Sequence, residues 1–255
     1  MSTVADKVKE WVSGGPGTDE EGAEFGGPEL TIVEHLQELR QRLTTCAIAL
    51  VIGTIIGLIF SDQIFRLLMV PAGPGFQTYV TEMTEMFTTY FKVAIMTGIA
   101  LAMPVFVWQV FGFVGPGLTH KERRIVFTLL PLVSLFFLFG MLFAYFVVLP
   151  FAVRYLLHFS DIANDIIRIS NYIGFVTTVE LWLGLAFETP LIIYMLAKVH
   201  LVDVKRLSSY RKYAILAVFI IAAAITPTPD PFNQTLVAVP LYLLYELGIL
   251  FARFA

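Results

Sequence analysis

Charged side chains are scarce in this sequence. Asp, Glu, Lys and Arg make up 15% of its 255 residues, whereas 57% of the residues are hydrophobic and the mean hydropathy is +0.78. A soluble domain of this length carries about 25% charged residues. The shortage of charge therefore excludes an ordinary soluble domain and indicates an integral membrane protein.

Cysteine and the common catalytic signatures are missing as well. A single cysteine, Cys46, leaves no partner for an intramolecular disulfide. The sequence contains no phosphate-binding loop, no His-Glu-x-x-His and no Cys-x-x-Cys. His158 and His200 have no neighbours at metal-ligand spacing. We therefore expect a protein that is not an enzyme and that uses no metal or cofactor.

Long apolar runs, in contrast, are abundant. Three uncharged runs reach the ~18 residues that suggest a transmembrane helix, at 43–60, 93–118 and 125–153. Three further runs carry acidic residues or end in prolines, at 173–197, 213–229 and 231–252. The sequence thus predicts an all-α integral membrane protein with six transmembrane helices. The fifth helix is expected to be short for a hydrocarbon core of ~30 Å.

The first 29 residues have a different composition. The stretch SGGPGTDEEGAEFGGPE at 13–29 is rich in Gly, Pro and acid and has almost nothing to bury. Such a composition is typical of disordered segments. We therefore divide the chain into a disordered acidic tail at 1–29 and a membrane domain at 30–255.

Lys and Arg are unevenly distributed between the segments that connect the predicted spans. Of the 17 Lys and Arg residues, only Arg66, Lys92, Arg154 and Arg168 lie on one side of the membrane, and the other 13 lie on the opposite side. Because Lys and Arg are retained on the cytoplasmic side, both termini are predicted to be cytoplasmic. The first cytoplasmic loop then contains the stretch LTHKERRIV at 118–126.

A glutamate in the middle of that basic stretch has two interpretations. Lys121, Arg123 and Arg124 are sufficient to orient the neighbouring spans, and Glu122 then only reduces their mutual repulsion. Alternatively, Glu122 accepts hydrogen bonds from a positively charged partner. The residues of the loop alone leave both interpretations open.

The stretch TIVEHLQELRQRL at 31–43 predicts an amphipathic helix that runs into the first span. Thr31 and Glu34 form a capping box at its start. The helical period places apolar residues on one face and polar residues on the other, namely Ile32, Leu36, Leu39 and Leu43 against Glu34, His35, Glu38 and Arg42. Glu38 and Arg42 have the favourable i,i+4 order.

Two glutamates lie in the fourth predicted span. Glu188 is near its middle, just before Pro190, which is expected to kink the helix, and Glu180 lies nearer the outer face. A carboxylate inside a bilayer costs about 2.5 kcal/mol or more, and it usually marks a functional site. Alternatively, Glu188 is a protonated residue that bonds to a neighbouring helix.

Two rival functional classes use these acids differently. Glu180, Glu188 and Glu246 together also fit a proton-coupled secondary transporter, although the sequence shows no inverted repeat. An integral membrane enzyme would need a nucleophile, a base or metal ligands on one face, and these are missing. Solute flux through the purified protein alone would distinguish a transporter from a receptor.

Five motifs together resemble one family. They are HLQELRQRL at 35–43, FVGPGLTHKERR at 113–124, FETP at 187–190, TPTPDPFNQT at 226–235 and YELGILFARF at 245–254. Over residues 31–254 the chain is similar to TatC, the signal-peptide receptor subunit of the twin-arginine protein translocase. It departs from the family pattern in the order of His120 and Lys121 and in one additional residue in the Thr-Pro turn.

The resemblance implies a concave six-helix bundle with short last two helices in the cytoplasmic membrane of a prokaryote. It also implies a receptor that binds twin-arginine signal peptides of folded cargo proteins and exports that cargo with the energy of the proton gradient. Its implied partners are TatA- and TatB-type single-span proteins, other TatC copies and membrane lipid, with no nucleic acid. In this family an arginine fork meets carboxylates, a role that the motifs carry over to Glu38 and Glu122.

Further residues follow from the same resemblance. The residues expected beside the two carboxylates are His35, Leu39, Arg40, Phe113, Pro116 and Arg124. The residues expected to form polar sites within the membrane or toward partners are Glu188, Glu180, Pro190, Asp230, Gln234 and Glu246. In the family, the glutamate at the position of Glu188 draws water into a concave membrane face. Glu180 is not part of the family pattern.

Overall fold

The computed structural model describes residues 32–73, 76, 78–114, 120–157, 167–198, 202–226 and 230–254. The predicted tail at 1–29 and the Thr31 cap lie outside these residues. The described helices are α2 (Ile32–Ile59), α3 (Ser61–Met69), η1 (Val70–Ala72), α4 (Glu85–Val114), α5 (His120–Phe143), π-helical η3 (Ala144–Val148), α6 (Leu149–Leu157), α7 (Ile169–Phe187), α8 (Thr189–Lys198), α9 (Val204–Ser209), α10 (Arg211–Ile225) and α11 (Pro231–Ala252).

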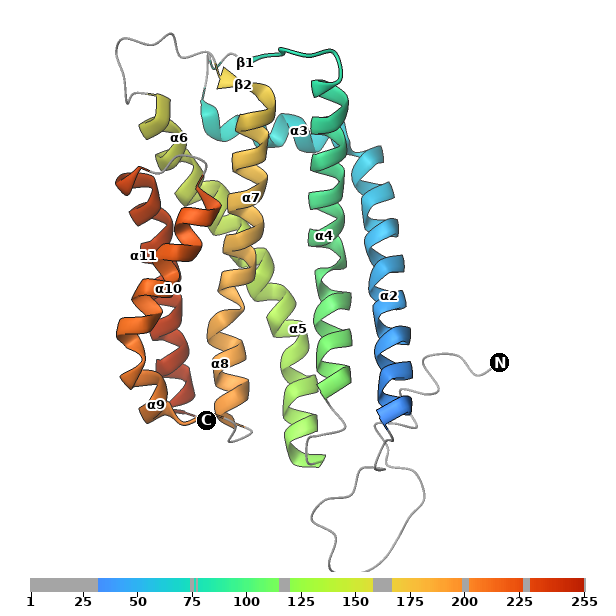
Figure 1. The fold of residues 1–255 in the computed structure, drawn as a ribbon, viewed down its shortest axis with the longest axis vertical. Helices are drawn as coiled ribbons and strands as arrows, with labels where there is room; N and C mark the ends of the chain where they lie inside the picture. The colour runs from blue at the N-terminus through green and yellow to red at the C-terminus, as the bar shows by residue number, and fades with distance from the viewer. Residues whose placement is uncertain are drawn as a thin grey trace, which may run out of the picture.

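The helices form the all-α membrane bundle that the sequence predicts (Figure 1). Five helical segments of the described chain are long and apolar enough to cross a membrane, namely His35–Ile59, Glu85–Phe113, Thr128–Leu156, Ile169–Lys198 and Pro231–Ala252. The predicted fifth span is α10, whose 15 residues extend about 22 Å at 1.5 Å per residue. It is therefore shorter than a ~30 Å hydrocarbon core, as expected.

The start of α2 and the end of α11 lie at the same end of the bundle, at the bottom of Figure 1. We call this the termini end. At the opposite end, the α3 end, lie α3 and a short parallel pair of strands, β1 (Thr78–Tyr79) and β2 (Ile167–Arg168). In the described chain, the first helix therefore begins and the last helix ends at the same end of the bundle.

The central helix of the bundle is α7, which packs against α3, α4, α5, α10 and α11. Its side chains Ile173, Val176, Val179 and Leu183 are completely buried, because apolar neighbours surround this helix on several sides. In contrast, only 11% of the α2 span is buried. In a membrane, the exposed apolar side chains of α2 face lipid.

Glycine lets α2 and α4 approach each other closely. A Cβ atom placed on Gly53 would lie 2.7 Å from the carbonyl oxygen of Gly98, and one on Gly57 would lie 2.6 Å from that of Ala94. Small residues permit such close backbone packing between membrane helices. The contact holds the second half of α2 against the first half of α4.

The predicted kink at Pro190 is a break between α7 and α8. Glu188 ends α7, and its carbonyl oxygen accepts hydrogen bonds from the N–H groups of Leu191 and Ile192. Proline has no N–H group to continue the helical ladder, which explains why the helix is interrupted here. The break places Glu188 within the Ile169–Lys198 span rather than at its end.

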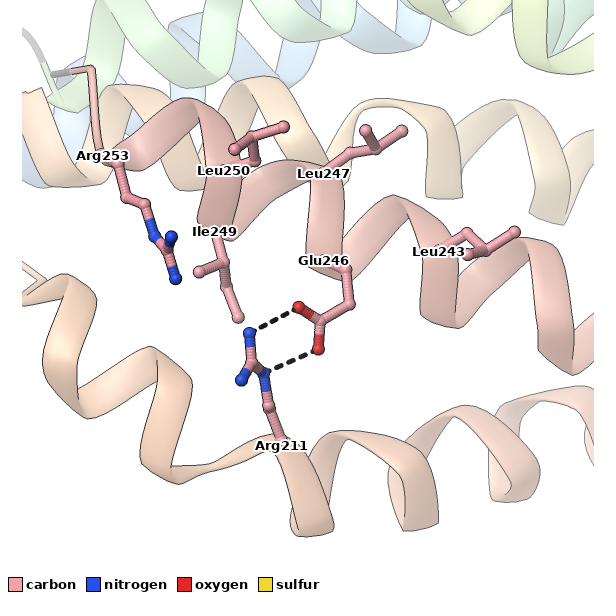
Figure 2. A pocket seen from close by; sticks show the side chains of 7 residues that line it. All are labelled: Arg211, Leu243, Glu246, Leu247, Ile249, Leu250 and Arg253. Atoms are coloured by element: carbon pink, nitrogen blue, oxygen red, sulfur yellow. Dashed lines mark hydrogen bonds and ion pairs between the residues drawn. The ribbon is translucent and has the colours of Figure 1, made fainter.

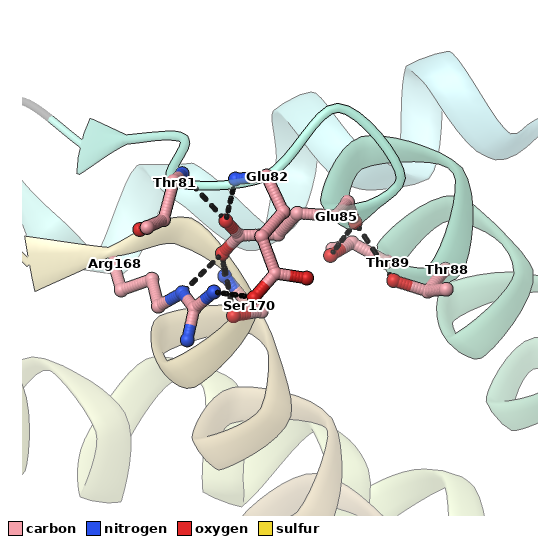
Figure 3. Close-up of polar contacts among 7 residues, drawn as sticks. All are labelled: Thr81, Glu82, Glu85, Thr88, Thr89, Arg168 and Ser170. Atoms are coloured by element: carbon pink, nitrogen blue, oxygen red, sulfur yellow. Dashed lines mark hydrogen bonds and ion pairs between the residues drawn. The ribbon is translucent and has the colours of Figure 1, made fainter.

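A polar cluster joins the α3 ends of α4 and α7 (Figure 3). Glu85 Oε1 accepts hydrogen bonds from Ser170 Oγ at 2.6 Å and from Arg168 Nε at 3.1 Å. Its Oε2 accepts one from the backbone N–H of Thr81 at 2.7 Å, and Arg168 also pairs with Glu82. These bonds connect the segment before α4 to the segment before α7, so the cluster stabilises this end of the bundle.

The charged stretch at 118–126 differs from the cytoplasmic loop that the sequence predicts. Residues from His120 onward form the first turns of α5. Lys, Glu and Arg are good helix formers, and an acidic residue such as Glu122 is favourable in the first turn of a helix. The side chain of Glu122 lies outside the described part of the structure.

Candidate functional site

The candidate site at the termini end begins with a pair of residues on α2. Arg42 donates hydrogen bonds from Nε, at 2.9 Å, and from Nη2 to the same carboxylate oxygen, Oε1 of Glu38. The sequence predicted this pair from its i,i+4 spacing. Both side chains are about one-fifth to one-quarter exposed, so the pair is accessible from solvent.

Arg42 also reaches across to α4. Its Nη1 donates hydrogen bonds to the side-chain oxygen of Gln109 at 3.2 Å and to the backbone oxygen of Gln109 at 3.4 Å. The guanidinium lies against Gly112, where any Cβ atom would collide with Nη1. Gly112 therefore makes room for Arg42, and Arg42 links the Glu38 carboxylate to the end of α4.

An aromatic contact brings a second motif to the same place. The His35 ring stacks on the Phe113 ring, with centroids 4.3 Å apart and an interplanar angle of 24°. His35 Nδ1 lies 3.8 Å from Glu38 Oε2, which is too far for a hydrogen bond. Glu38 Oε2 thus accepts no hydrogen bond from the described residues, although Oε1 accepts two.

The other residues predicted for this site are placed less completely. Leu39 and Arg40 are exposed on α2. Arg124 is exposed on α5, and α5 packs against α4, as α2 does. Pro116 lies outside the described residues. The structure therefore brings His35, Glu38 and Phe113 together, and no contact among the described residues joins them to Arg124. Sequence reasoning missed Gln109, because no local pattern marks a residue that binds across two helices.

Within the span formed by α7 and α8, two acids are buried. Glu188 is 5% exposed and Glu180 is 9% exposed. Oε1 of Glu188 is buried and accepts no hydrogen bond from the described residues. A buried ionised carboxylate without a partner is unfavourable, so Glu188 requires a proton, water or a hydrogen-bond donor from another molecule. Pro190, two residues later, is also buried.

The remaining predicted polar residues lie near the two ends of α11. Asp230 caps its start, since Oδ1 accepts a hydrogen bond from the Asn233 N–H at 2.7 Å. Gln234 donates from Nε2 to the Phe219 backbone oxygen at 3.0 Å and thereby ties α11 to α10. Glu246 lies at the termini end.

Glu246 forms a bidentate pair with Arg211, the first residue of α10. Tyr242 donates a further hydrogen bond to Glu246 at 2.7 Å. Glu246 is thus a paired residue near a helix end, which removes one of the three acids on which the transporter interpretation depends. In the described part of the chain, no group of three or more His, Cys, Asp and Glu residues could hold a metal ion.

Comparison with known proteins gives a consistent result along the chain. The family described as Sec-independent protein translocase protein (TatC) matches residues 34–240. The TatC protein of Carboxydothermus hydrogenoformans is 40% identical over 227 residues, which cover 88% of this chain and 93% of that protein. The TatC protein of Escherichia coli K12 is 35% identical over 231 residues, which cover 88% of each chain.

A solved structure agrees with these relatives. A crystal structure of the twin-arginine translocase receptor TatC superposes with a TM-score of 0.79 at 36% identity, covering 87% of this chain and 99% of that chain. The likeness therefore includes the fold as well as the motifs. This chain belongs to the TatC family and is a multi-pass membrane component of a Sec-independent protein translocase.

Proposed function

We propose that this protein is the subunit that binds twin-arginine signal peptides. Glu38 and Glu122 each accept hydrogen bonds from one arginine of the peptide on the cytoplasmic face, which is the termini end of the bundle. The receptor assembles with TatA- and TatB-type single-span proteins and with further TatC copies. The assembly exports folded cargo with the energy of the proton gradient.

The observation that carries this proposal is the asymmetry of the Glu38 carboxylate. Oε1 is held by Arg42, and Arg42 is held in turn by Gln109 on α4. Oε2 accepts no hydrogen bond from the described residues and lies beside the stacked rings of His35 and Phe113. A carboxylate fixed through one oxygen and open at the other is preorganised to bind a guanidinium without losing much side-chain entropy.

Arginine suits such a site better than lysine. Its planar guanidinium stays charged and donates hydrogen bonds in a fixed fork, whereas the lysine ammonium is a compact, strongly hydrated charge. Charge-assisted hydrogen bonds contribute about 1.5–3 kcal/mol. Loss of one such bond should therefore weaken binding roughly ten- to a hundredfold.

Titration of labelled peptides tests this role for Glu122. We expect wild type in nanodiscs to bind an Arg-Arg signal peptide much more tightly than a Lys-Lys peptide. The Glu122→Gln variant should bind the Arg-Arg peptide roughly ten- to a hundredfold more weakly and lose less affinity for the Lys-Lys peptide. Equal affinities for both peptides and both proteins would contradict recognition and leave Glu122 as a topology residue.

Glu188 has a separate role in this proposal. Its buried, unpartnered oxygen lies where the helix is interrupted, and a carboxyl group there attracts water into the membrane domain. The short α10 agrees with a locally thin bilayer. Glu188→Ala should insert normally but impair transport, and Glu188→Gln should be milder because an amide still binds water. Wild-type transport by Glu188→Ala would make Glu188 a structural residue.

A further inference from the structure

A cavity of about 440 Å³ lies between the start of α10 and the end of α11 at the termini end (Figure 2). The residues that line it are Arg211, Leu243, Glu246, Leu247, Ile249, Leu250 and Arg253. It thus combines two arginines and one glutamate with a wall of leucines. The proposed recognition site at Glu38 is formed by other helices, α2 and α4, and does not share these residues.

The charges of the cavity do not cancel. Arg211 donates from Nε to Glu246 Oε1 and from Nη2 to Glu246 Oε2, both at 2.8 Å, so this pair is neutral as a whole. Arg211 Nη1 and the guanidinium of Arg253 have no acceptor among the described residues. Figure 2 shows the Arg253 guanidinium on the same side of α11 as that of Arg211. One positive charge therefore remains, with donors that point toward the cavity.

The apolar wall continues from this charge along α11. Leu243, Leu247 and Leu250 are 56%, 43% and 44% exposed, and they follow one another at helical spacing along the span Pro231–Ala252. In a membrane these side chains face acyl chains, whereas Arg253 caps the end of the same helix, where the headgroups lie. The cavity is cationic at the interface and apolar toward the bilayer.

We propose that this cavity binds an anionic phospholipid of the leaflet at the termini end. Its phosphate accepts hydrogen bonds from Arg253 and from Arg211 Nη1, and an acyl chain lies against the three leucines. Basic pockets between transmembrane helices bind anionic headgroups in this way. A soluble phosphate would contact the arginines but not the leucines. An acidic partner helix would not require the arginines to lie at the level of the lipid headgroups. The lipid uses both parts of the cavity.

Arg206 on α9 provides a matched control for Arg253. It is an exposed arginine at the same end of the bundle that does not line the cavity. The experiment compares wild type, Arg253→Gln and Arg206→Gln in the full-length chain by native mass spectrometry. Each protein is equilibrated in detergent with phosphatidylglycerol or with phosphatidylcholine of the same acyl chains, and glycerol 3-phosphate serves as the soluble competitor.

We expect wild type to retain phosphatidylglycerol in preference to phosphatidylcholine, and Arg253→Gln to retain it roughly tenfold more weakly, which is about 1.4 kcal/mol. Arg206→Gln should remain within about twofold of wild type, because Arg206 does not line the cavity. The two variants have the same net charge, so a difference between them does not come from the general charge of the protein. Arg253→Lys should recover part of the loss and excludes misfolding as its cause.

Three outcomes would overturn the proposal. Equal losses in Arg253→Gln and Arg206→Gln would mean that the general positive charge attracts lipid. Equal retention of the two lipids would mean that the leucines alone hold a chain. Full displacement by glycerol 3-phosphate would assign the arginines to a soluble anion. None of these results depends on signal-peptide binding, which the assay does not measure.

Discussion

Glu38 and Glu246 lie at the same end of the bundle, and each is paired with an arginine, but their carboxylates are used differently. Arg42 occupies only one oxygen of Glu38, and the pair lies on a single helix. Arg211 occupies both oxygens of Glu246 from a different helix, and Tyr242 adds a third donor. Glu246 has fewer acceptor positions left, whereas Glu38 still has a whole oxygen to offer.

The comparison teaches that an ion pair by itself says little about function. Both glutamates are partly exposed, at 24% and 29%, so burial does not separate them. The number of occupied oxygens does separate them. A saturated carboxylate joins helices, and a half-occupied one can receive a ligand, which leads to different expectations for the same substitution.

The largest expected effect is on signal-peptide binding. Glu38→Gln should weaken binding of an Arg-Arg peptide roughly ten- to a hundredfold, because it removes a charged acceptor. Glu246→Gln removes the same charge from the same end of the protein and should change binding by less than about twofold. Fluorescence titration in nanodiscs measures both. Similar losses in the two variants would show that the peptide senses net charge rather than the open oxygen.

A smaller effect is expected on thermal stability, where Glu246→Gln should be more damaging than Glu38→Gln. Glu246→Gln breaks a bidentate pair between α10 and α11, and we expect the midpoint of thermal unfolding in detergent to fall by about 2–4 °C. Glu38→Gln should lower it less, since Arg42 keeps its bonds to Gln109 on α4. Thermal unfolding followed by tryptophan fluorescence gives both midpoints. A larger fall for Glu38→Gln would reverse the assignment of roles.

The features that depend on neighbouring residues in the chain could be predicted from the sequence. The Glu38–Arg42 pair follows from i,i+4 spacing in a periodic stretch, and the helix break follows from the chemistry of Pro190. Both depend on residues within one turn of each other. The apolar runs predicted the spans for the same reason, because hydrophobicity and length are properties of a contiguous segment.

The contacts between helices could not be predicted in the same way. Arg211, the partner of Glu246, is 35 positions away in the chain. In the sequence, Arg168 serves only to orient the spans, but its guanidinium pairs with Glu85 at the α3 end. The role of Gly112, which is to leave room for the guanidinium of Arg42, can be recognised only from the contact between the two helices. Each of these depends on helix rotation and register, which are set by packing in three dimensions.

The smallest expected effect concerns Gln109, the residue that ties the Glu38–Arg42 pair to α4. In Gln109→Ala the side-chain acceptor at 3.2 Å is lost, but the backbone oxygen at 3.4 Å remains. Arg42 then holds Glu38 with more freedom, so part of the preorganisation is lost. We expect Arg-Arg peptide binding to weaken about two- to fivefold, which is about 0.4–1 kcal/mol.

Gln41→Ala is the matched control for this variant, because Gln41 is an exposed glutamine on α2 whose side chain makes no hydrogen bond with the described residues. It should bind the peptide as wild type does. Titrations of the two variants under the same conditions make the comparison. If Gln109→Ala also binds like wild type, the side chain of Gln109 is not needed to hold Arg42 and Glu38. In that case the bond within α2 and the backbone oxygen of Gln109 are sufficient to keep the open oxygen of Glu38 in place.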